Sequence, residues 1–443
     1  MRRRLGPAQT VFLGFLLLIL TGTFLLSLPI STSTGSRAPL VDALFTANSA
    51  ICVTGLIVVD TGKYWSHFGQ IVILTLIQLG GLGYMTIASL IVLILRRRIT
   101  LEEKLAFKEG MDQFSMSEIA HFIKQVIKTT VLIEGVGAFI LFLHWQDRFG
   151  MPGAAYKGVF HAISAFCNAG FSLFSNNLED YKGDVVVSIT IMCLVVIGGI
   201  GYTVIRDIYH HYITKRKHRQ LYFHTRSVLT MTAILILSGA FFIFFFESVN
   251  PQVFQQLSLK EKILSSFFQS IAPRTAGFSS IPIGQMAIPT LLLLIILMFI
   301  GASPGGTGGG IKTTTFLVLI SSTWSTIKRR RDVQIFKRRI PEEVIYKSFA
   351  IFIIALSLIV VVTFFMLNTE GKGLVPVLFE VVSAFGTVGL STGITPTLTS
   401  AGKLLLIVTM FIGRVGLLTF AVAFTRRRED PLYRYPEERI LVG

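Results

Sequence analysis

The chain has 443 residues, of which 52% are hydrophobic and only 15% are charged, with a formal net charge of +17 at pH 7. Its mean hydropathy is +0.68. This composition is typical of a protein that crosses a membrane many times, and it excludes an ordinary soluble domain.

Long apolar runs recur along the whole chain. A bilayer core of about 30 Å requires roughly 20 apolar residues in a helix. We therefore predict an all-α polytopic membrane protein with eight spans, near residues 10–30, 69–95, 123–143, 184–205, 227–246, 286–300, 348–367 and 403–424. The first run lacks a clear small-x-small cleavage site and seven more follow it, so we expect a span and not a cleaved signal peptide.

The basic residues predict the topology. Five segments beside apolar runs hold 29 of the 41 Lys and Arg residues: 1–9, 96–128, 206–226, 328–347 and 426–443. Because basic loops stay in the cytoplasm, we predict a multi-pass protein of the cell membrane with both termini cytoplasmic. This topology, with attraction to anionic lipid, accounts for the charge without a nucleic-acid partner.

Four segments share a pattern centred on one glycine: Gly55, Gly170, Gly277 and Gly389, at intervals of 115, 107 and 112 residues. A phenylalanine stands ten residues before each: Phe45, Phe160, Phe267 and Phe379. A serine stands six residues before the glycine in three copies, Ser49, Ser164 and Ser383. The third copy has Ile271 there, with Ser270 one place earlier. This regularity predicts four copies of one structural unit.

Each glycine segment lies between two apolar runs and is too short and too polar to cross the membrane. The predicted unit is a span, a short pore helix with a re-entrant loop, and a second span (M1-P-M2), and four such units surround one central pore. A second glycine site follows in each unit, where we expect close helix packing: Gly80-Gly81, Gly198-Gly199, Gly301 and Gly413. The expected boundaries are 1–98, 99–214, 215–335 and 336–425 for repeats 1 to 4, and 426–443 for a cytoplasmic C-terminal tail.

Irregular backbone at membrane depth predicts an ion path. Unpaired carbonyl groups are costly in lipid but tolerated along a water-filled pore. Four re-entrant loops around one axis form rings of carbonyl oxygens that replace the hydration shell of a monovalent cation. Glycine permits the backbone angles that aim these carbonyls at the axis.

These segments resemble a known superfamily of potassium transporters, which includes bacterial Trk and Ktr systems, plant HKT and fungal Trk proteins. The stretches closest to the Ktr-type membrane subunit are 161-HAISAFCNAGFSLF-174, 272-APRTAGF-278, 383-SAFGTVGLSTGITP-396 and 411-FIGRVGLLTF-420. The likeness extends over essentially the whole chain. Eight spans, without two extra N-terminal ones, favour the Ktr type over the Trk type.

The resemblance implies that backbone carbonyls of one triplet from each loop form a K⁺ selectivity filter: Val53, Thr54, Gly55; Asn168, Ala169, Gly170; Thr275, Ala276, Gly277; and Thr387, Val388, Gly389. In this superfamily, a serine in place of the first filter glycine accompanies sodium permeation. All four glycines are present here, which favours potassium. The loops otherwise depart from TVGYG, so we expect looser selectivity than in true potassium channels.

One apolar stretch must be interrupted, because a helix over residues 286–327 would be about 63 Å long, twice a bilayer core. We expect the break at 303-SPGGTGGG-310. A phosphate-binding loop needs glycine directly before lysine, whereas Ile311 stands before Lys312. A packing kink is an alternative. The resemblance favours an intramembrane gating loop over 303–312, with Gly305, Gly306, Thr307, Gly308, Gly309, Gly310 and Lys312.

Ionisable residues at membrane depth are functional candidates. The resemblance favours Arg414 as an electrostatic pore barrier; a tie to backbone carbonyls or to Glu380 is the alternative. Arg274 and Glu380 are expected to support the filter, Arg274 from behind it and Glu380 by pairing with a basic group or adding negative potential. Glu134 is interpreted as a hydrogen-bonded packing residue. Acidic residues on the predicted outer side attract cations or are simply solvated: Asp42, Asp60, Glu179, Asp180 and Asp184.

The sequence shows no acid–base pair, nucleophile constellation or metal-ligand cluster, so we predict no enzyme and no cofactor on this chain. Cys52, Cys167 and Cys193 lack metal spacing and are expected to pack without a disulfide. The resemblance implies a homodimer on a cytoplasmic ring of nucleotide-binding subunits, with ATP, ADP or cyclic di-AMP on that partner and K⁺ as substrate; activation by Na⁺ is left open. The alternative is a secondary transporter that couples K⁺ entry to Na⁺ or H⁺, although such proteins more often have inverted repeats. A membrane anchor or receptor would leave the fourfold pattern unexplained.

Overall fold

The computed structural model describes residues 7–82, 116–212 and 221–416, with two single residues near the C-terminus. Several predicted features lie outside the described residues: the basic clusters Arg2 to Arg4, Arg96 to Arg98, Lys215 to Lys217 and Arg426 to Arg428, the far ends of the runs 69–95 and 403–424, and nearly all of the tail 426–443.

The described part of the chain is predominantly helical, which confirms the predicted all-α class. Its strands form a single antiparallel hairpin of β1 (Gln334–Ile335) and β2 (Arg338–Arg339), in which Gln334 pairs with Arg339. The helices follow one another in four groups, and each group contains one of the glycine loops.

The first group comprises α1 (Pro7–Ser27), η1 (Pro29–Ser31), α2 (Leu40–Ile51), α3 (Thr61–Tyr64) and α4 (His67–Gly81). The second comprises α7 (Met116–Phe166), η2 (Glu179–Tyr181), α8 (Val185–Ile200) and α9 (Tyr202–Tyr212). Backbone angles at Gly150 (φ 68°, ψ 166°), two residues before Pro152, divide α7 into a long and a short helix. Proline removes a helical hydrogen bond and stops the chain from continuing straight.

The third group comprises α10 (Phe223–Glu247), α11 (Leu259–Ile271), η3 (Ile283–Gln285), α12 (Ile288–Phe299) and α13 (Thr313–Ile327). The fourth comprises α14 (Glu342–Glu370), α15 (Leu374–Gly386), η4 (Thr395–Thr397) and α16 (Ser400–Val415). In every group a short helix stands directly before the glycine loop, and a short helical turn stands after it. The expected pore helix over 41–50 corresponds to α2.

Three described helices are long and apolar enough to cross a membrane: Lys124–Phe166, Phe223–Glu247 and Glu342–Glu370. A fourth candidate is α8 with α9, bent by 99° at Gly201. The remaining apolar helices are shorter, so the number of eight spans stays a prediction.

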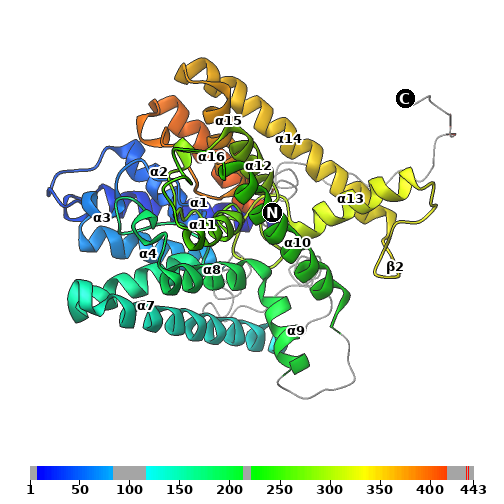
Figure 1. The fold of residues 1–443 in the computed structure, drawn as a ribbon, viewed down its shortest axis with the longest axis horizontal. Helices are drawn as coiled ribbons and strands as arrows, with labels where there is room; N and C mark the ends of the chain where they lie inside the picture. The colour runs from blue at the N-terminus through cyan, green and yellow to red at the C-terminus, as the bar shows by residue number, and fades with distance from the viewer. Residues whose placement is uncertain (1–6, 83–115, 213–220, 417–435, 437, 439–443) are drawn as a thin grey trace, which may run out of the picture.

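The four groups are arranged in a closed circuit. Helix α4 packs on α7, α8 on α11, α12 on α15, and α16 returns to α2. In Figure 1, α7 runs along the lower edge and α14 along the upper right, while α13 and the β-hairpin project at the right-hand end. Each group therefore contacts the next one along the chain, and the last contacts the first.

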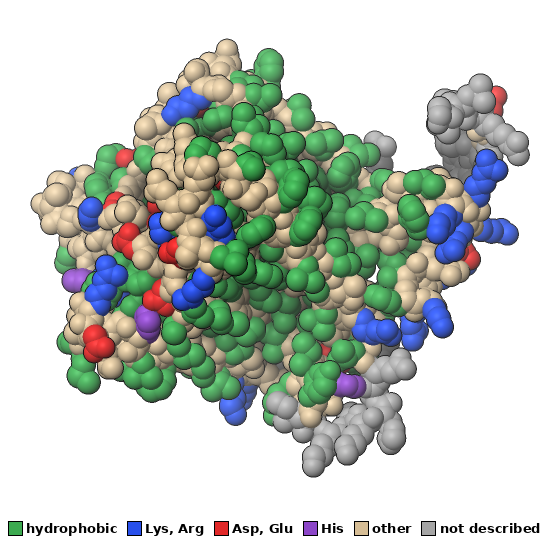
Figure 2. Space-filling view, in the orientation of Figure 1, with side chains coloured by type: hydrophobic (Ala, Val, Ile, Leu, Met, Phe, Trp, Pro, Cys, Tyr) green, Lys and Arg blue, Asp and Glu red, His purple; other side chains and the backbone are tan. Residues whose placement is uncertain are grey.

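The face drawn in Figure 2 has an apolar middle between two charged ends. Figure 2 shows hydrophobic side chains over the middle of this face, with Lys and Arg gathered at the end near α13 and β2. The exposed basic residues there include Lys328 to Arg331. The opposite end carries acidic and basic side chains together. Such a pattern fits the membrane class inferred from composition.

The phenylalanines of the pattern are buried in the core in the first, second and fourth groups, but not in the third. Phe45, Phe160 and Phe379 have no exposed surface. Phe267 is only half-buried, and its neighbour Phe268 is 3% exposed. The third group thus uses the adjacent position to fill the same kind of space.

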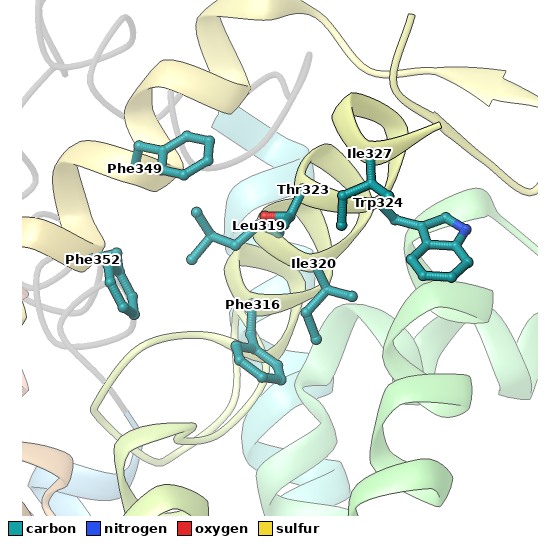
Figure 3. A pocket seen from close by; sticks show the side chains of 8 residues that line it. All are labelled: Phe316, Leu319, Ile320, Thr323, Trp324, Ile327, Phe349 and Phe352. Carbon is teal, nitrogen blue, oxygen red and sulfur yellow. The ribbon is translucent and has the colours of Figure 1, made fainter. Parts of the chain in front are cut away.

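An apolar groove of about 320 Å³ opens between α13 and α14 (Figure 3). Thr323 is the one polar residue in its lining: Phe316, Leu319, Ile320, Thr323, Trp324, Ile327, Phe349 and Phe352. A dehydrated cation needs several oxygen ligands, which this lining does not provide. We therefore exclude the groove as an ion path.

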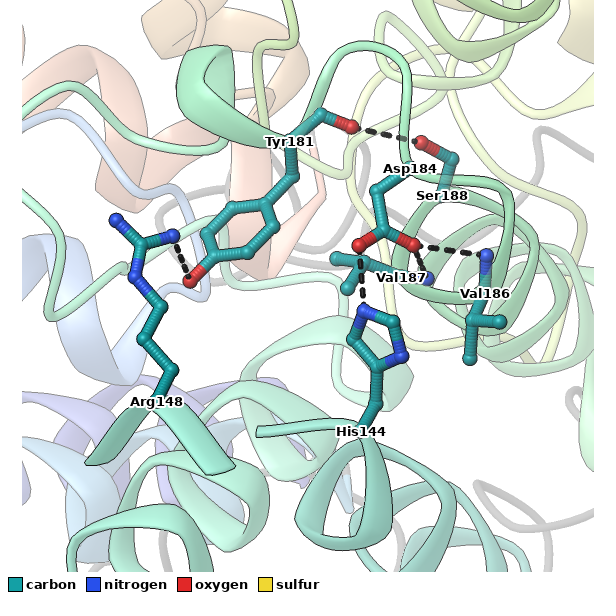
Figure 4. Close-up of polar contacts among 7 residues, drawn as sticks. All are labelled: His144, Arg148, Tyr181, Asp184, Val186, Val187 and Ser188. Carbon is teal, nitrogen blue, oxygen red and sulfur yellow. Dashed lines mark hydrogen bonds and ion pairs between the residues drawn. The ribbon is translucent and has the colours of Figure 1, made fainter. Parts of the chain in front are cut away.

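Polar contacts join the end of the long part of α7 to the start of α8 (Figure 4). Asp184 caps α8 by accepting hydrogen bonds from the backbone N–H groups of Val186 (3.0 Å) and Val187 (3.1 Å). Its other carboxylate oxygen lies 2.5 Å from Nε2 of His144. Nearby, Arg148 donates to the hydroxyl of Tyr181 at 3.1 Å.

Two other acidic residues of the predicted outer side also have structural partners. Asp42 lies 2.7 Å from Nζ of Lys403. Asp60 caps α3 through the N–H groups of Gly62 and Lys63. Together with Asp184, these residues hold helix ends, and simple solvation does not describe them.

We predict that Asp184→Ala lowers stability by about 1 kcal/mol, because α8 loses its N-terminal cap. In a protein of this size the melting temperature in detergent should fall by roughly 1–3 °C. Asp180→Ala is the matched control, since Asp180 is exposed and lies in the same loop. Equal melting temperatures for the two variants would contradict the assignment.

Candidate functional site

The four key glycines lie against one another. A Cβ atom added to Gly55 would lie 3.1 Å from the Cα atom of Gly170, and one added to Gly170 would lie 2.6 Å from that of Gly277. One added to Gly277 would lie 3.3 Å from the Cα atom of Gly389, and one added to Gly389 would lie 3.0 Å from that of Gly55. The four backbones therefore form a closed ring in chain order, although more than 100 residues separate each from the next.

Glycine is required at these positions for two reasons. The φ angles of Gly55, Gly170, Gly277 and Gly389 are +88°, +70°, +69° and +93°, which side chains disfavour. A Cβ atom at Gly389 would also lie 2.2 Å from the carbonyl oxygen of Thr54, and the other three have comparable clashes. No substitution fits without moving a neighbouring loop.

The residue two places before each glycine also has a positive φ angle. The values are 55° at Val53, 59° at Asn168, 66° at Thr275 and 49° at Thr387. Left-handed backbone in a residue that is not glycine costs on the order of 1–3 kcal/mol, and most in β-branched residues. The same strained angle at the same place in four loops indicates that the surrounding structure imposes it.

The carbonyl oxygens of the twelve triplet residues are almost all free. Within the described part of the chain they accept no hydrogen bond, with the single exception of Gly277. Buried carbonyl groups in proteins are nearly always paired with protein or water. A group of unpaired carbonyls converging on one ring is suited to coordinate a cation.

Serine hydroxyls hold three of the loops. The Oγ atom of Ser49 donates to the carbonyl after the key glycine (2.7 Å) and accepts from the glycine N–H (3.1 Å). Ser164 makes the first of these bonds at 2.7 Å, and Ser383 makes the second at 3.1 Å. In the third group, Ser270 donates instead to the carbonyl of Ile236 in α10. The third loop thus lacks this support.

The second glycine sites allow close packing, as predicted. A Cβ atom at Gly80, Gly198 or Gly413 would lie 2.1, 1.9 or 2.0 Å from the carbonyl oxygen four residues before the key glycine of its own group. Gly301 is different, because its Cβ atom would meet the carbonyl of Gly309 at 2.1 Å. Three of these glycines seat the helix after the loop (α4, α8 or α16) on the end of the short helix before it.

The predicted helix break occurs between Phe299, where α12 ends, and Thr313, where α13 begins. The intervening loop is closed on itself, since the N–H of Gly301 donates to the carbonyl of Ile311 at 2.8 Å. Lys312 also bonds within the loop: its Nζ donates to the carbonyl of Gly308 at 2.6 Å.

The loop lies against two of the triplets. The N–H of Gly309 donates to Oγ1 of Thr387 at 2.9 Å. A Cβ atom at Gly308 would lie 1.9 Å from Oγ1 of Thr275. Of the residues predicted for gating, Gly308 and Gly309 therefore contact the first residues of the third and fourth triplets.

The same loop is bonded to the bend between α8 and α9. Tyr202 N–H donates to the carbonyl of Gly305 at 3.2 Å, and Ser303 N–H donates to that of Gly199 at 3.1 Å. Thr307 N–H donates to the carbonyl of Gly198 at 3.3 Å. The amino-acid sequence gave no indication of this contact, because backbone groups make it and no side-chain type marks it.

Arg414 joins the loop to the first group. Its guanidinium donates to the carbonyls of Thr307 and Gly80. Glu380 is not its partner: that carboxylate is fully buried and accepts from Ser391 Oγ (2.6 Å), Thr392 N–H (3.0 Å) and Thr395 Oγ1 (2.6 Å). The expected pairing of Glu380 with a basic group is therefore wrong within the described residues; Glu380 supports the segment after the fourth glycine instead.

The other singled-out residues have the following surroundings. The side chain of Arg274 is buried, and its Nε has no hydrogen-bond partner in the described part of the chain, while Asn168 donates to its carbonyl at 3.2 Å. Glu134 accepts from Gln78 at 3.4 Å and contacts Sγ of Cys167 at 3.7 Å, as expected of a hydrogen-bonded packing residue. The three cysteines are free, with Cys193 exposed.

The chain is similar to known cation transport proteins. The TrkH family, described as "Cation transport protein", matches residues 9–433. The Ktr system potassium uptake protein B of Bacillus subtilis is 41% identical over 99% of this chain and 97% of its own length. The potassium/sodium uptake protein NtpJ of Enterococcus hirae is 37% identical over 100% of this chain and 98% of its own length.

The fold also has a solved counterpart. The crystal structure of the potassium transporter TrkH from Vibrio parahaemolyticus aligns with a TM-score of 0.72 at 19% identity and covers 96% of this chain and 86% of that one. At this identity the likeness concerns the fold alone.

We predict that Glu380→Ala destabilises the protein by about 2 kcal/mol or more, because buried or half-buried donors of Ser391, Thr392 and Thr395 lose a carboxylate acceptor. Glu370→Ala is the control: that carboxylate also accepts from a helix start, through Thr399, but in an exposed position. Thermal unfolding in detergent should show a larger loss for Glu380→Ala. A larger loss for Glu370→Ala would contradict this role.

Proposed function

The chain belongs to the TrkH family of cation transport proteins, and on that premise we propose that it is the ion-translocating subunit of a potassium uptake system. The observation that carries the proposal is the closed ring of four glycine loops with unpaired carbonyl oxygens. In this proposal the twelve triplet residues form the selectivity filter. The family comprises transporters and not enzymes.

Permeation through such a ring requires no catalytic group. The carbonyls replace the water ligands of K⁺, and the membrane potential draws the cation inward by about 2.3 kcal/mol per charge per 100 mV. Na⁺ is a competing or activating ion in this proposal. The relative named for potassium and sodium uptake is a reason to measure both ions. The ratio of the two uptake rates is therefore the property to measure.

The proposed architecture is four M1-P-M2 units with eight spans, in the cell membrane, with both termini in the cytoplasm. The order of long helix, short helix, glycine loop and second helix supports it. The basic end near α13 and β2 then faces the cytoplasm, in keeping with the distribution of Lys and Arg.

The loop 303–312 is proposed as the gate. It contacts the first residues of two triplets and is held by Lys312, by Arg414 and by the bend at Gly201. Opening would break the bonds from Arg414 to Thr307 and from Gly309 to Thr387. Glycine lowers the cost of the alternative loop shapes that opening needs.

The proposed assembly is a homodimer on a cytoplasmic ring of nucleotide-binding subunits, with ATP or ADP on that partner and no cofactor on this chain. The words "Ktr system" in the names of three relatives support a system of several components. Helix α9 is suited to receive a signal, because its first residue is bonded to the gating loop. A secondary transporter coupling K⁺ to Na⁺ or H⁺ is the alternative; the ring of four parallel loops favours a pore.

We predict that Gly389→Ser reduces the K⁺/Na⁺ uptake ratio, because any side chain there collides with the carbonyl of Thr54. The measurement is uptake of both ions by cells that lack their own potassium uptake systems, with the cognate ring co-expressed. Gly393→Ser is a matched control, since Gly393 has a φ angle of +95° but open space around it. An unchanged ratio at normal membrane abundance would remove the filter assignment.

We predict that Arg414→Ala increases cation flux severalfold, because the loop loses its tie to the first group and the pore loses a positive charge. Arg414→Gln separates the two causes, since glutamine keeps a donor without the charge. An increase in flux in both variants indicates an electrostatic barrier. An increase in flux in Arg414→Ala alone indicates that the hydrogen bonds of Arg414 to the loop limit the flux. Wild-type flux in both, at normal abundance, would exclude Arg414 from gating.

A further inference from the structure

The third glycine loop differs from the other three in its support. Ile271 occupies the position of the bracing serines, and Ser270 is bonded to α10 instead. The backbone differs as well: the N–H of Ala276 donates to the carbonyl of Ala272 at 2.9 Å. In the other loops the equivalent N–H bonds to the carbonyl of the bracing serine itself.

A neighbouring group supplies a contact that the third loop lacks. Nδ2 of Asn177, in the segment after the second loop, donates to the carbonyl oxygen of Gly277 at 3.3 Å. The N–H of Leu178 donates to the carbonyl of Ser279 at 3.0 Å. The loop is thus held from the side by the adjacent group, in addition to bonds within its own group from Gln269 to Ser279 (3.1 Å) and from Ala276 to Ala272.

Asn177 is itself held in place. It has a φ angle of 55°, which asparagine tolerates better than most residues. Its N–H donates to the carbonyl of Phe174 at 3.1 Å, and its carbonyl accepts from Ser172 Oγ at 3.4 Å. An amide oxygen turned toward the Gly277 carbonyl would repel it, so the Nδ2 atom is the one that faces the filter.

The contact makes the ring of carbonyls unequal. The carbonyls of Gly55, Gly170 and Gly389 accept no hydrogen bond from the described residues, whereas that of Gly277 accepts one. A carbonyl oxygen has two lone pairs. A donor that bonds to one of them weakens the oxygen as a ligand for a cation and fixes the direction of the carbonyl group. Selectivity among monovalent cations depends on the number, position and field strength of such oxygens.

We propose that Asn177 is a specificity-determining residue of the ion path, which fixes the third loop and sets the strength of the Gly277 carbonyl. This inference rests on the proposed function, in which the triplets form the filter. Asn177 acts through Gly277 and is therefore a positioning residue, so its loss should alter the preference among ions and not merely the amount of folded protein.

The test is Asn177→Gly, which keeps the backbone angle and removes the amide. We expect the K⁺/Na⁺ ratio of initial uptake rates in proteoliposomes to change by about threefold to tenfold, which is the effect of losing one hydrogen bond. The control is Asn176→Gly, at an adjacent exposed position, which should keep the wild-type ratio.

Gly389→Ser, measured in the same preparation, separates this inference from the function on which it rests. If Asn177→Gly lowers thermal stability but keeps the wild-type ratio while Gly389→Ser changes it, the role of Asn177 is overturned and the filter stands. If neither variant changes the ratio, both assignments fall.

Discussion

The contact of four glycine backbones around one point is the constraint on which the rest of the structure depends. These backbones come closer than any pair of side chains would permit, so the loops must approach the point with no Cβ atom between them. Each loop then needs a rigid support that stops short of that point. The four short helices provide this support, and their ends determine where the carbonyl oxygens lie.

Such a ring is unfavourable on its own. It combines left-handed backbone at Val53, Asn168, Thr275 and Thr387 with carbonyl groups of which nearly all lack partners among the described residues. The surrounding structure offsets these costs through many ordinary contacts, among them serine hydroxyls at the helix ends and glycines that let the helices after the loops lie directly on them. Strain that is concentrated in the loops is thus supported by close packing in the helices.

The sequence predicted the local features that recur along the chain, but not the contacts that are specific to one pair of loops. The spacing of the glycines, the break before Thr313 and the close packing at Gly80, Gly198 and Gly413 all follow from local chemistry that recurs along the chain. For Arg414 the sequence offered a tie to backbone carbonyls as an alternative, but not which carbonyls. The partners of Glu380 and Asn177 did not follow at all, because they depend on which loop lies beside which after folding. Phe267 shows the same limit: the pattern pointed to it, but its neighbour Phe268 is the one that the core buries.

The third group departs from the others in several ways at once: it has no bracing serine, its buried phenylalanine is shifted, and the glycine-rich loop interrupts its last helix. A ring built from four identical chains could not do this, because every change would appear in all four quarters. Joining the quarters in one polypeptide removes that restriction, so a single quarter can diverge while the other three keep the ring intact. Departure from symmetry in one quarter is thus a freedom that this architecture provides.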